Sequence, residues 1–352
     1  MMSKLRSRFF FVPILVLLTA CGSGGEPHSG GSNTSTGLPN DINGLIVLNV
    51  EGRYGKKDYR GIYKIDFKNG QVKTHTFLTS QINGINPYAH DRNTISYAEP
   101  CSGGDRYLHS RMKIINEKGI STARILPCSS ELLNGTGVFL VAKISPDKSK
   151  IAIEVDNGAA PSNSYLTNFI VMVFDRYTGE ALSSFRGYES PDWLPDGRLL
   201  MSSSVANNDN EGIFIASKDF KNLTRIDQGR INQSVSFLNV NPSGNRLIFT
   251  MSGKIWMMDI DNDYSLNHLQ ELVSAGAENI QTPIWSPDGK YIAFVNYAGP
   301  RSIWTAGRSS QIITFWNINS KKSHVFNITT AFPAWQQINK WLGPGAYMSW
   351  VE

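Results

Sequence analysis

Several side chains with useful chemistry fall in segments of the sequence that have the composition of long loops. Arginine and histidine can bind anions or move protons, carboxylates can act as bases, and tyrosine and tryptophan supply contact area. The candidates are Arg53, Tyr54, Arg106, His109, Tyr165, Asp209, Trp304 and Arg308. Taken singly, each is more typical of a solvated loop. Taken together, they have the composition of a contact surface.

Several common motifs for catalysis and cofactor binding are absent from the sequence. It contains no Gly-x-Ser-x-Gly nucleophile elbow, no His-Glu-x-x-His zinc motif and no phosphate-binding loop. Asp259, Asp261 and Asp263 are spaced like the start of a calcium loop, but Tyr264 stands where that loop requires glycine. We therefore expect no assembled catalytic set, no bound metal and no cofactor.

A repeated turn sequence indicates the elements that position the candidate side chains. Its four copies are centred on Pro146, Pro195, Pro242 and Pro287, at intervals of 45 to 49 residues. Proline presets φ, aspartate bonds its own backbone and glycine accepts positive φ, so a Pro-Asp-Gly run favours a tight turn. An apolar stretch precedes each turn and a β-rich run follows it. Each copy therefore predicts a β-hairpin.

Further strands are expected after each hairpin. The third strands are predicted at residues 168–175, 212–216, 254–259 and 311–317, and a less regular fourth strand follows each of them. Four antiparallel strands in a unit of about 45 residues are typical of a β-propeller blade.

Two weaker units precede the four clear ones, and they decide the number of blades. One begins at residues 88–95, and the other offers only three strands, at 44–50, 61–67 and 72–77. The segment 332–341, with Trp335 and Trp341, would supply the missing innermost strand and close the ring. We expect an all-β, six-bladed propeller of four-stranded antiparallel blades, with N- and C-terminal strands sharing one blade. A seventh blade made of the terminal segment alone would lack its outer strands.

The repeat resembles the TolB-like (PD40, WD40-like) propeller repeat, most closely in Trp-Ser-Pro-Asp-Gly-Lys-Tyr-Ile-Ala-Phe at 285–294. The next strand of that family commonly reads Ile-Tyr/Trp-x-apolar-Asp, as residues 62–66 and 255–259 do. The resemblance covers roughly residues 42–352 and implies the propeller fold. It implies no single function, because the family includes periplasmic scaffolds, oligopeptidase propellers and sugar-acid lyases. The α/β domain that precedes the propeller of TolB is not expected here, so a Tol-system role does not follow.

The N-terminus has the pattern of a lipoprotein signal. Three basic residues precede an apolar run at 9–18 that is short for a membrane span, and Leu-Thr-Ala-Cys then ends at Cys21. We expect a signal peptide at 1–20, a lipidated Cys21 with a flexible Gly- and Ser-rich tether at 21–41, and the propeller at 42–352. An ordinary secretory signal with a coincidental cysteine is the alternative.

A lipidated Cys21 predicts a protein of the bacterial cell envelope, anchored to a membrane by acyl chains such as palmitate. Gly22 rather than aspartate follows Cys21, so in a Gram-negative cell we expect the periplasmic side of the outer membrane. Removal of the signal takes away three positive charges, and the net charge falls from +5 to about +2. No basic stripe remains, and no nucleic-acid partner is expected.

Cys101 and Cys128 are predicted to form a disulfide. They follow the second and fourth strands of one blade, which end on the same rim, and an oxidising compartment favours the bond. A loop of this length would stabilise the fold by about 3 kcal/mol. A metal pair and a redox pair are the alternatives, and both lack the required spacing.

The two rims of such a ring differ in their loops. The Pro-Asp-Gly turns mark a tight rim, while long connections at 51–59, 100–110, 157–166, 205–211 and 297–310 mark the opposite rim and carry the candidate residues. This favours a non-catalytic binding or scaffold module for a protein or an envelope glycan, with its site on the long-loop rim. The alternative is a sugar lyase or hydrolase at the central channel, for which His109 and Arg106 would have to converge with Arg308 or Asp209.

Overall fold

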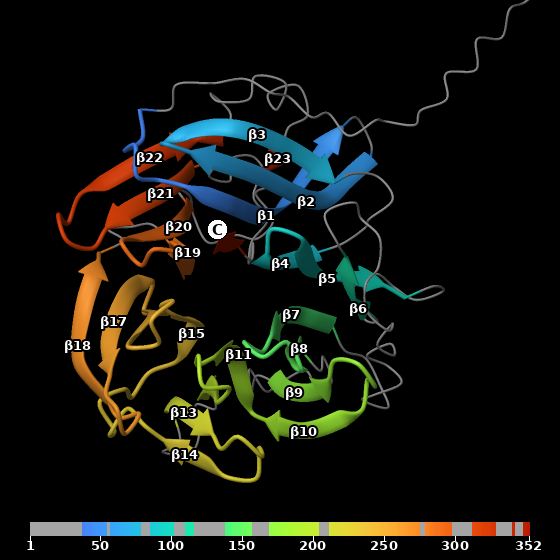
Figure 1. Cartoon of the computed structure of the whole chain (residues 1–352), viewed down its shortest axis with the longest axis vertical. Coiled ribbons are helices and arrows are strands. Elements are labelled where there is room, and N and C mark those ends of the chain that lie inside the picture. Colours follow the sequence, from blue (N-terminus) through green and yellow to red (C-terminus); the bar gives the residue numbers. More distant parts are fainter. Residues whose placement is uncertain are drawn as a thin grey trace, which may run out of the picture.

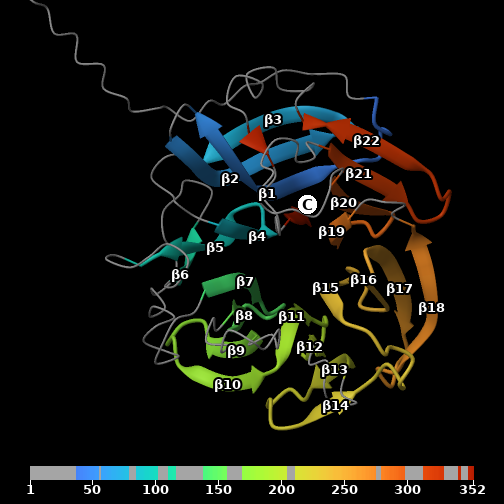
Figure 2. The same ribbon diagram turned by 180° about the vertical axis from the view of Figure 1, so that it is seen from behind.

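A computed structural model of the chain describes residues 37–54, 57–78, 85–101, 110–115, 138–156, 169–203, 211–274, 279–297, 312–328, 340–341 and 348–352. These residues form six antiparallel sheets arranged as blades around a central axis (Figure 1). The same ring is seen from behind in Figure 2. The chain is a six-bladed β-propeller, as the repeat predicts. None of the described residues belongs to a helix that is long and apolar enough to cross a membrane.

Apart from two C-terminal strands that join blade 1, the strands of the first three blades follow one another along the chain. Blade 1 contains β1 (Gly44–Tyr54), β2 (Lys57–Lys68), β3 (Gln71–Leu78), β23 (Lys340–Trp341) and β24 (Met348–Val351). Blade 2 contains β4 (Ile85–Asp91), β5 (Thr94–Pro100) and β6 (Ser110–Ile115). Blade 3 contains β7 (Val138–Ile144), β8 (Lys150–Asp156), β9 (Phe169–Asp175) and β10 (Ala181–Arg186).

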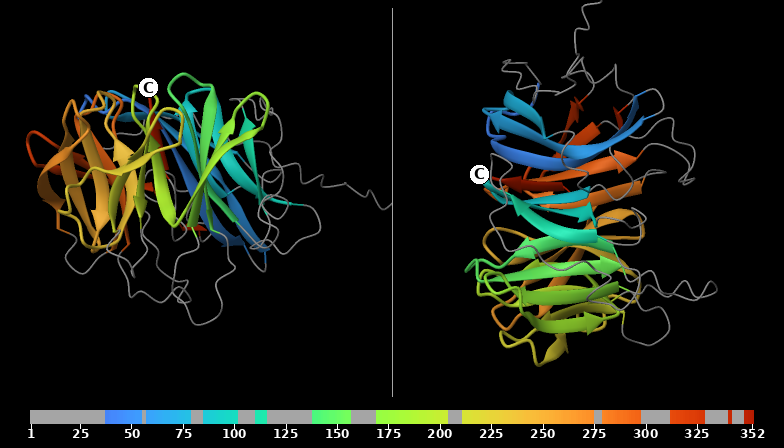
Figure 3. Two further views of the ribbon diagram at one scale, coloured as in Figure 1. Left: turned by 90° about the horizontal axis from the view of Figure 1, so that it is seen from below. Right: turned by 90° about the vertical axis from the view of Figure 1, so that its right-hand side faces the viewer.

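The other three blades have four strands each. Blade 4 contains β11 (Tyr188–Trp193), β12 (Leu199–Ser203), β13 (Gly212–Ala216) and β14 (Leu223–Arg225). Blade 5 contains β15 (Val235–Val240), β16 (Arg246–Met251), β17 (Lys254–Ile260) and β18 (Leu266–Val273). Blade 6 contains β19 (Asn279–Trp285), β20 (Tyr291–Tyr297), β21 (Ile312–Asn317) and β22 (Ser323–Asn327). Seen from the side, the strands run between the two rims of the ring (Figure 3).

The predicted turns form by the expected chemistry. Asp147 accepts a hydrogen bond from Ser145 Oγ at 2.5 Å and one from Ser149 Oγ at 2.7 Å. These bonds hold the pKa of the Asp147 carboxyl well below its usual range. The fourth residue of the turn has positive φ in every copy, at Gly197, Gly244 and Gly289 and also at Lys148. The aspartates of the motif are therefore turn formers.

The ring closes in blade 1, but its main closing strand lies further along the chain than the sequence indicates. Residues 332–339 lie outside the described residues, and β23 pairs with β1 only at Glu51 and Gly52. The longer pairing is made by β24, where Trp350 lies opposite Ile46. Trp350 packs edge-on against Phe315 at 5.3 Å and donates to Asn43 O at 2.8 Å. Trp350 therefore joins blade 1 to blade 6.

Apolar clusters between neighbouring blades make up the core. One cluster joins blades 1 and 6, and Phe67 lies at its centre, 5.7 Å from Phe315 and 5.2 Å from Phe326. Similar clusters join blades 4 and 5 and blades 2 and 3. Leu38 is buried in the first cluster, so the described end of the predicted tether packs against the propeller.

Candidate functional site

The innermost strands share a local irregularity that determines which side chains face the axis. The pairing register shifts in β4, β7, β11, β15 and β19. In four of these strands a residue near the shift has positive φ: Asn86, Ser190, Phe237 and Thr282. Such β-bulges bend a strand and re-aim the side chains that follow.

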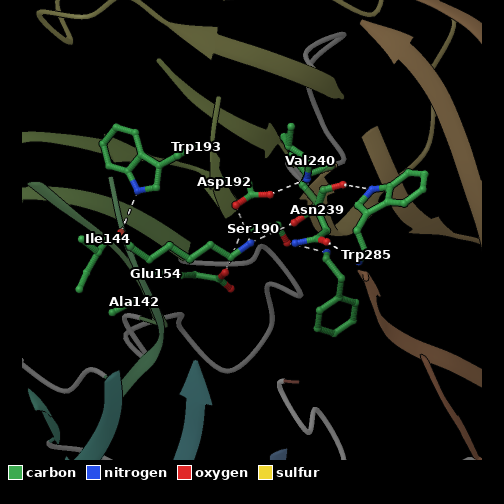
Figure 4. Close-up of polar contacts among 12 residues, drawn as sticks. Ala142, Ile144, Glu154, Ser190, Asp192, Trp193, Asn239, Val240 and Trp285 are labelled. Carbon is green, nitrogen blue, oxygen red and sulfur yellow. Dashed lines mark hydrogen bonds and ion pairs between the residues drawn. The ribbon is translucent and has the colours of Figure 1, made fainter. Parts of the chain in front are cut away.

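The same position of each repeat follows the bulge. In blades 3 to 6 it is the second-to-last residue of the innermost strand. Equivalent positions in all six blades are Ser349, Tyr88, Lys143, Asp192, Asn239 and Ile284, which we call the inner ring. Several inner-ring side chains accept a backbone N–H of the next blade. Ser349 Oγ accepts from Ala89 at 2.7 Å, Asp192 Oδ2 from Val240 at 2.6 Å, and Asn239 Oδ1 from Trp285 at 2.9 Å. The contacts of Asp192 and Asn239 are visible in Figure 4.

Lys143 is the most connected member of the inner ring. Its Nζ lies 3.0 Å from Asp192 Oδ1, donates to Leu238 O at 3.1 Å, and stands 5.1 Å from the centre of the Tyr88 ring. Lys143 and Asp192 are both buried, so their charges are paired away from water. This single side chain of blade 3 contacts blades 2, 4 and 5. Removing one partner of a buried ion pair strongly destabilises a protein, because the other charge is left buried and unpaired.

A second buried carboxyl group lies beside this ion pair. Glu154 on β8 accepts a hydrogen bond from the Ser190 amide at 2.9 Å, as Figure 4 shows. Burial raises the pKa of Glu154 to about 7, although the Ser190 bond and the charge of Lys143 act in the other direction. The group is therefore close to half-protonated at neutral pH.

His90 connects blades 2 and 3 through a complete chain of hydrogen bonds. Its Nδ1 accepts from the Ile144 amide at 3.2 Å, so Nε2 carries the proton and donates to Ser96 Oγ at 2.9 Å. Ser96 Oγ in turn donates to Ala142 O at 2.8 Å. Burial, followed by the charge of Arg176, lowers the pKa of His90 to about 3. His90 is thus a neutral structural residue.

A hollow of about 430 Å³ opens above the inner ring, and we call it the cup. Residues of blades 1 to 5 line it, and among its walls are turn and strand-end residues: Thr94, Pro146, Arg176, Pro195, Pro242 and Trp350. Lys143, Tyr88 and Asn239 also line a cavity of only about 30 Å³ deeper along the axis. These three residues separate the two spaces, so they form the floor of the cup.

The small axial cavity has room for little more than one water molecule. At this volume the cavity is too small for a substrate. Glu154 and Thr282 line it, and Thr282 Oγ1 is buried without a hydrogen-bond partner among the described residues.

Another hollow, of about 450 Å³, lies away from the axis beside blade 1. Its charged lining has both signs and includes Asp41, Lys73 and Glu352, while Arg92 pairs with Asp66 at 3.0 Å. No inner-ring residue lines it. Within the described part of the chain, no group of three or more metal-ligating side chains is found. We take the cup as the candidate site, because five blades converge on it.

The predicted site residues lie mostly outside the described residues. This holds for Cys21, Cys128, Arg106, His109, Tyr165, Asp209, Trp304 and Arg308. Cys101 is buried after the end of β5, and its disulfide with Cys128 stays a prediction. The segment 51–59, expected as a loop, is instead mostly strand. In the backbone register of β1 and β2, Arg53 lies opposite Asp58 and Tyr54 lies opposite Lys57.

The cup lies on the rim of tight turns, where the sequence predicts no binding site. Three turn prolines line it, so it is on the tight rim, whereas the sequence favours the long-loop rim. The aspartates of the Pro-Asp-Gly motif stabilise the turns, as predicted, but residues next to them line the cup. Alignment of the repeats shows Lys143, Asp192 and Asn239 at one position, and this was the available signal for the inner ring.

Comparisons with known proteins extend the account of the fold. No protein-family model matches this chain, and no curated protein sequence matches it. Solved structures do. A nidogen/laminin complex aligns with a TM-score of 0.56 and 10% identity, over 88% of this chain and 99% of that one. The likeness is one of fold.

Two further structures align less closely. A putative TolB from Agrobacterium tumefaciens gives a TM-score of 0.49 and 12% identity, over 88% of this chain and 99% of the other. An oligogalacturonate lyase from Vibrio parahaemolyticus gives 0.49 and 13% identity, over 85% and 84%. At such low identity, structural likeness transfers no activity or partner to this propeller.

Proposed function

We propose that this chain is a non-catalytic binding protein that receives a segment of a protein partner in the cup. The observation that carries the proposal is the cup itself. It is a polar hollow of about 430 Å³ at the axis, lined by five blades and closed below by Lys143, Tyr88 and Asn239. Concave sites with a few fixed polar groups are where proteins usually bind ligands.

Binding is favoured over catalysis by the state of the polar groups. Lys143, Asp192 and Asn239 are occupied by contacts between blades, and His90 is occupied at both ring nitrogens. Glu154 has a pKa suited to a general base, but it lines the small axial cavity. The enzymatic alternative depends on His109, Arg106, Arg308 and Asp209, which lie outside the described residues.

The lipobox at Cys21 supports a place for this binding protein at a membrane of the bacterial cell envelope. Replacement of the lipidated thiol tests the anchor. We expect Cys21→Ser to move the protein from the membrane fraction to the soluble fraction, because the acyl chains are lost. A Cys21→Ser protein that stays in the membrane fraction would contradict the anchor while leaving the cup untouched.

Photo-crosslinking from inside the cup tests the binding function. A benzoylphenylalanine at Thr94 would lie in the cup, while one at Val325, an exposed position on β22, would lie outside it. We expect an adduct of defined mass from Thr94 in intact cells and none from Val325. Equal adducts from both positions, or none from Thr94, would refute the proposal.

A further inference from the structure

We propose that the cup holds a carboxylate of an acidic peptide segment on Arg176 and Lys148. This inference rests on the proposed binding function and adds the chemistry of the ligand. Both residues line the cup on the side of blade 3, Lys148 in the turn after β7 and Arg176 directly after β9.

The floor of the cup has little capacity left for a charged ligand. Lys143 is paired with Asp192, and the other oxygen of Asp192 accepts the Val240 amide. The wall residue Asn241 is also occupied, because its Oδ1 accepts the amides of Asn245 and Arg246. The groups that remain for a ligand are donors on the wall.

Arg176 is the clearest of these donors. Its one side-chain bond among the described residues is a long one, from Nη1 to Lys148 O at 3.4 Å, and it makes no ion pair there. A guanidinium has five N–H donors in a fork that matches the two oxygens of a carboxylate. Its charge helps to lower the pKa of His90, so the guanidinium lies close to the described wall of the cup. Arg176 therefore offers an open site for an anion.

Lys148 stands where the other turns have glycine. Gly197, Gly244 and Gly289 hold φ of 88°, 75° and 70°, and Lys148 holds 61° at the same turn position. A side chain with a Cβ is strained at positive φ, so the fold would favour glycine here as well. The strained residue keeps an ammonium group at the cup. Strain of this kind is often found at functional sites.

The ammonium of Lys148 is only loosely held. It lies 3.4 Å from Asp91 Oδ2, and the two side chains are 63% and 40% exposed. An exposed pair at this distance is weak, so a carboxylate of the ligand can replace Asp91. Of the charged groups that line the cup, Lys143, Lys148 and Arg176 are cationic, and Asp91 and Asp192 are anionic. One positive charge is left over, and a negatively charged ligand complements it.

Two substitutions with matched controls test this inference. Arg176→Gln removes the open guanidinium, and Arg186→Gln removes the same charge from the exposed outer strand β10 of the same blade. Lys148→Gly removes a lysine of positive φ from the cup, and Lys321→Gly removes one of φ 55° from an exposed turn of blade 6. Both glycine variants should melt at or above the temperature of the unchanged protein, because strain is relieved.

The probe is a fluorescein-labelled peptide with glutamates separated by serine and alanine, compared with the same peptide carrying glutamines. Anisotropy titrations with the full chain should show at least tenfold tighter binding of the glutamate peptide. Arg176→Gln should remove that preference and Lys148→Gly should reduce it, while Arg186→Gln and Lys321→Gly keep it. Glutarate should displace the peptide better than inorganic phosphate.

Several results would overturn the inference. These are equal binding of the two peptides, no saturable binding of the glutamate peptide, an equal loss with Arg186→Gln, or better displacement by phosphate than by glutarate. Adducts from Thr94 that do not change with Arg176→Gln would refute the carboxylate site and leave the binding function standing. Absence of those adducts would refute the binding function itself.

Discussion

Lys143 and Glu154 show how residues at a propeller axis can be buried without forming a catalytic site. Lys143 crosses to three other blades, and its charge is matched by Asp192. Glu154 accepts a hydrogen bond from the Ser190 amide but is buried away from water, and burial raises its pKa to about 7. At the residue scale, the axis is a set of contacts that hold blades together.

The raised pKa of Glu154 has a consequence for stability. A carboxyl group with a folded-state pKa of about 7 stabilises the fold fully below pH 4.5, its unfolded value, and loses that contribution as pH rises through 7. The loss is at most about 3 kcal/mol. We expect Glu154→Gln to raise the free energy of unfolding at pH 8 by up to this amount, with no gain below pH 4.5. Urea unfolding at pH 4.5 and pH 8 measures the difference.

A matched surface variant and a second titrating residue sharpen this test. Glu180→Gln changes an exposed glutamate after β9 and should alter neither value. His90 acts in the opposite direction, because its folded pKa of about 3 makes the protein lose stability as pH falls from 6.5 toward 3. The original protein and Glu154→Gln share this loss, so it cancels when their free energies of unfolding are compared. A Glu154→Gln protein that is less stable at pH 8 than at pH 4.5, relative to the original, would refute the assignment.

At the scale of the element, the turns were predictable and the contacts of the inner ring were not. Proline, aspartate and glycine determine a turn through their own backbone and neighbouring atoms, so the sequence shows the turns directly. The inner ring is made of contacts between residues far apart in the chain, nearly fifty positions for Lys143 with Asp192 and 260 for Ser349 with Ala89. No local pattern reveals such a contact. The bulges at Ser190 and Phe237 have no glycine to mark them either.

The closing strand shows the same limit. Trp335 has the local surroundings of a blade turn, yet the long pairing with β1 is made by Met348–Val351. What selects β24 is packing: Met348 and Trp350 alternate into the cluster between blades 1 and 6. That criterion depends on the shape of a core that is built from distant strands.

Trp350 is therefore expected to be essential for closure. Trp350→Ala removes a buried ring from this cluster and should lower the free energy of unfolding by about 3–5 kcal/mol. Trp350→Phe keeps most of the packing and loses the bond to Asn43 O, at a cost of about 1 kcal/mol. Tyr177→Ala, at a ring that is 68% exposed, is the near-neutral control. Denaturant unfolding that places Trp350→Ala within 1 kcal/mol of the original protein would contradict closure by β24.

At the scale of the whole molecule, the period of the repeat determined the architecture, and the ring has the expected six blades. The site did not follow from the architecture. Long loops favoured one rim, while the cup was found on the other, because turn residues and inner-ring residues together surround the axis there. Lys148 has a strained conformation at the position where the other repeated turns have glycine. The sequence shows this directly, because its turn is the one Pro-Asp copy of the repeat without glycine.

The most direct test of the account compares the two rims in one experiment. The photo-crosslinking residue is placed at Thr94 in the cup, or at Tyr165, a candidate of the long-loop rim, and intact cells are irradiated. Our account predicts a defined protein adduct from Thr94 at clearly higher yield than from Tyr165. An adduct from Tyr165 with none from Thr94 would contradict it and return the site to the long-loop rim.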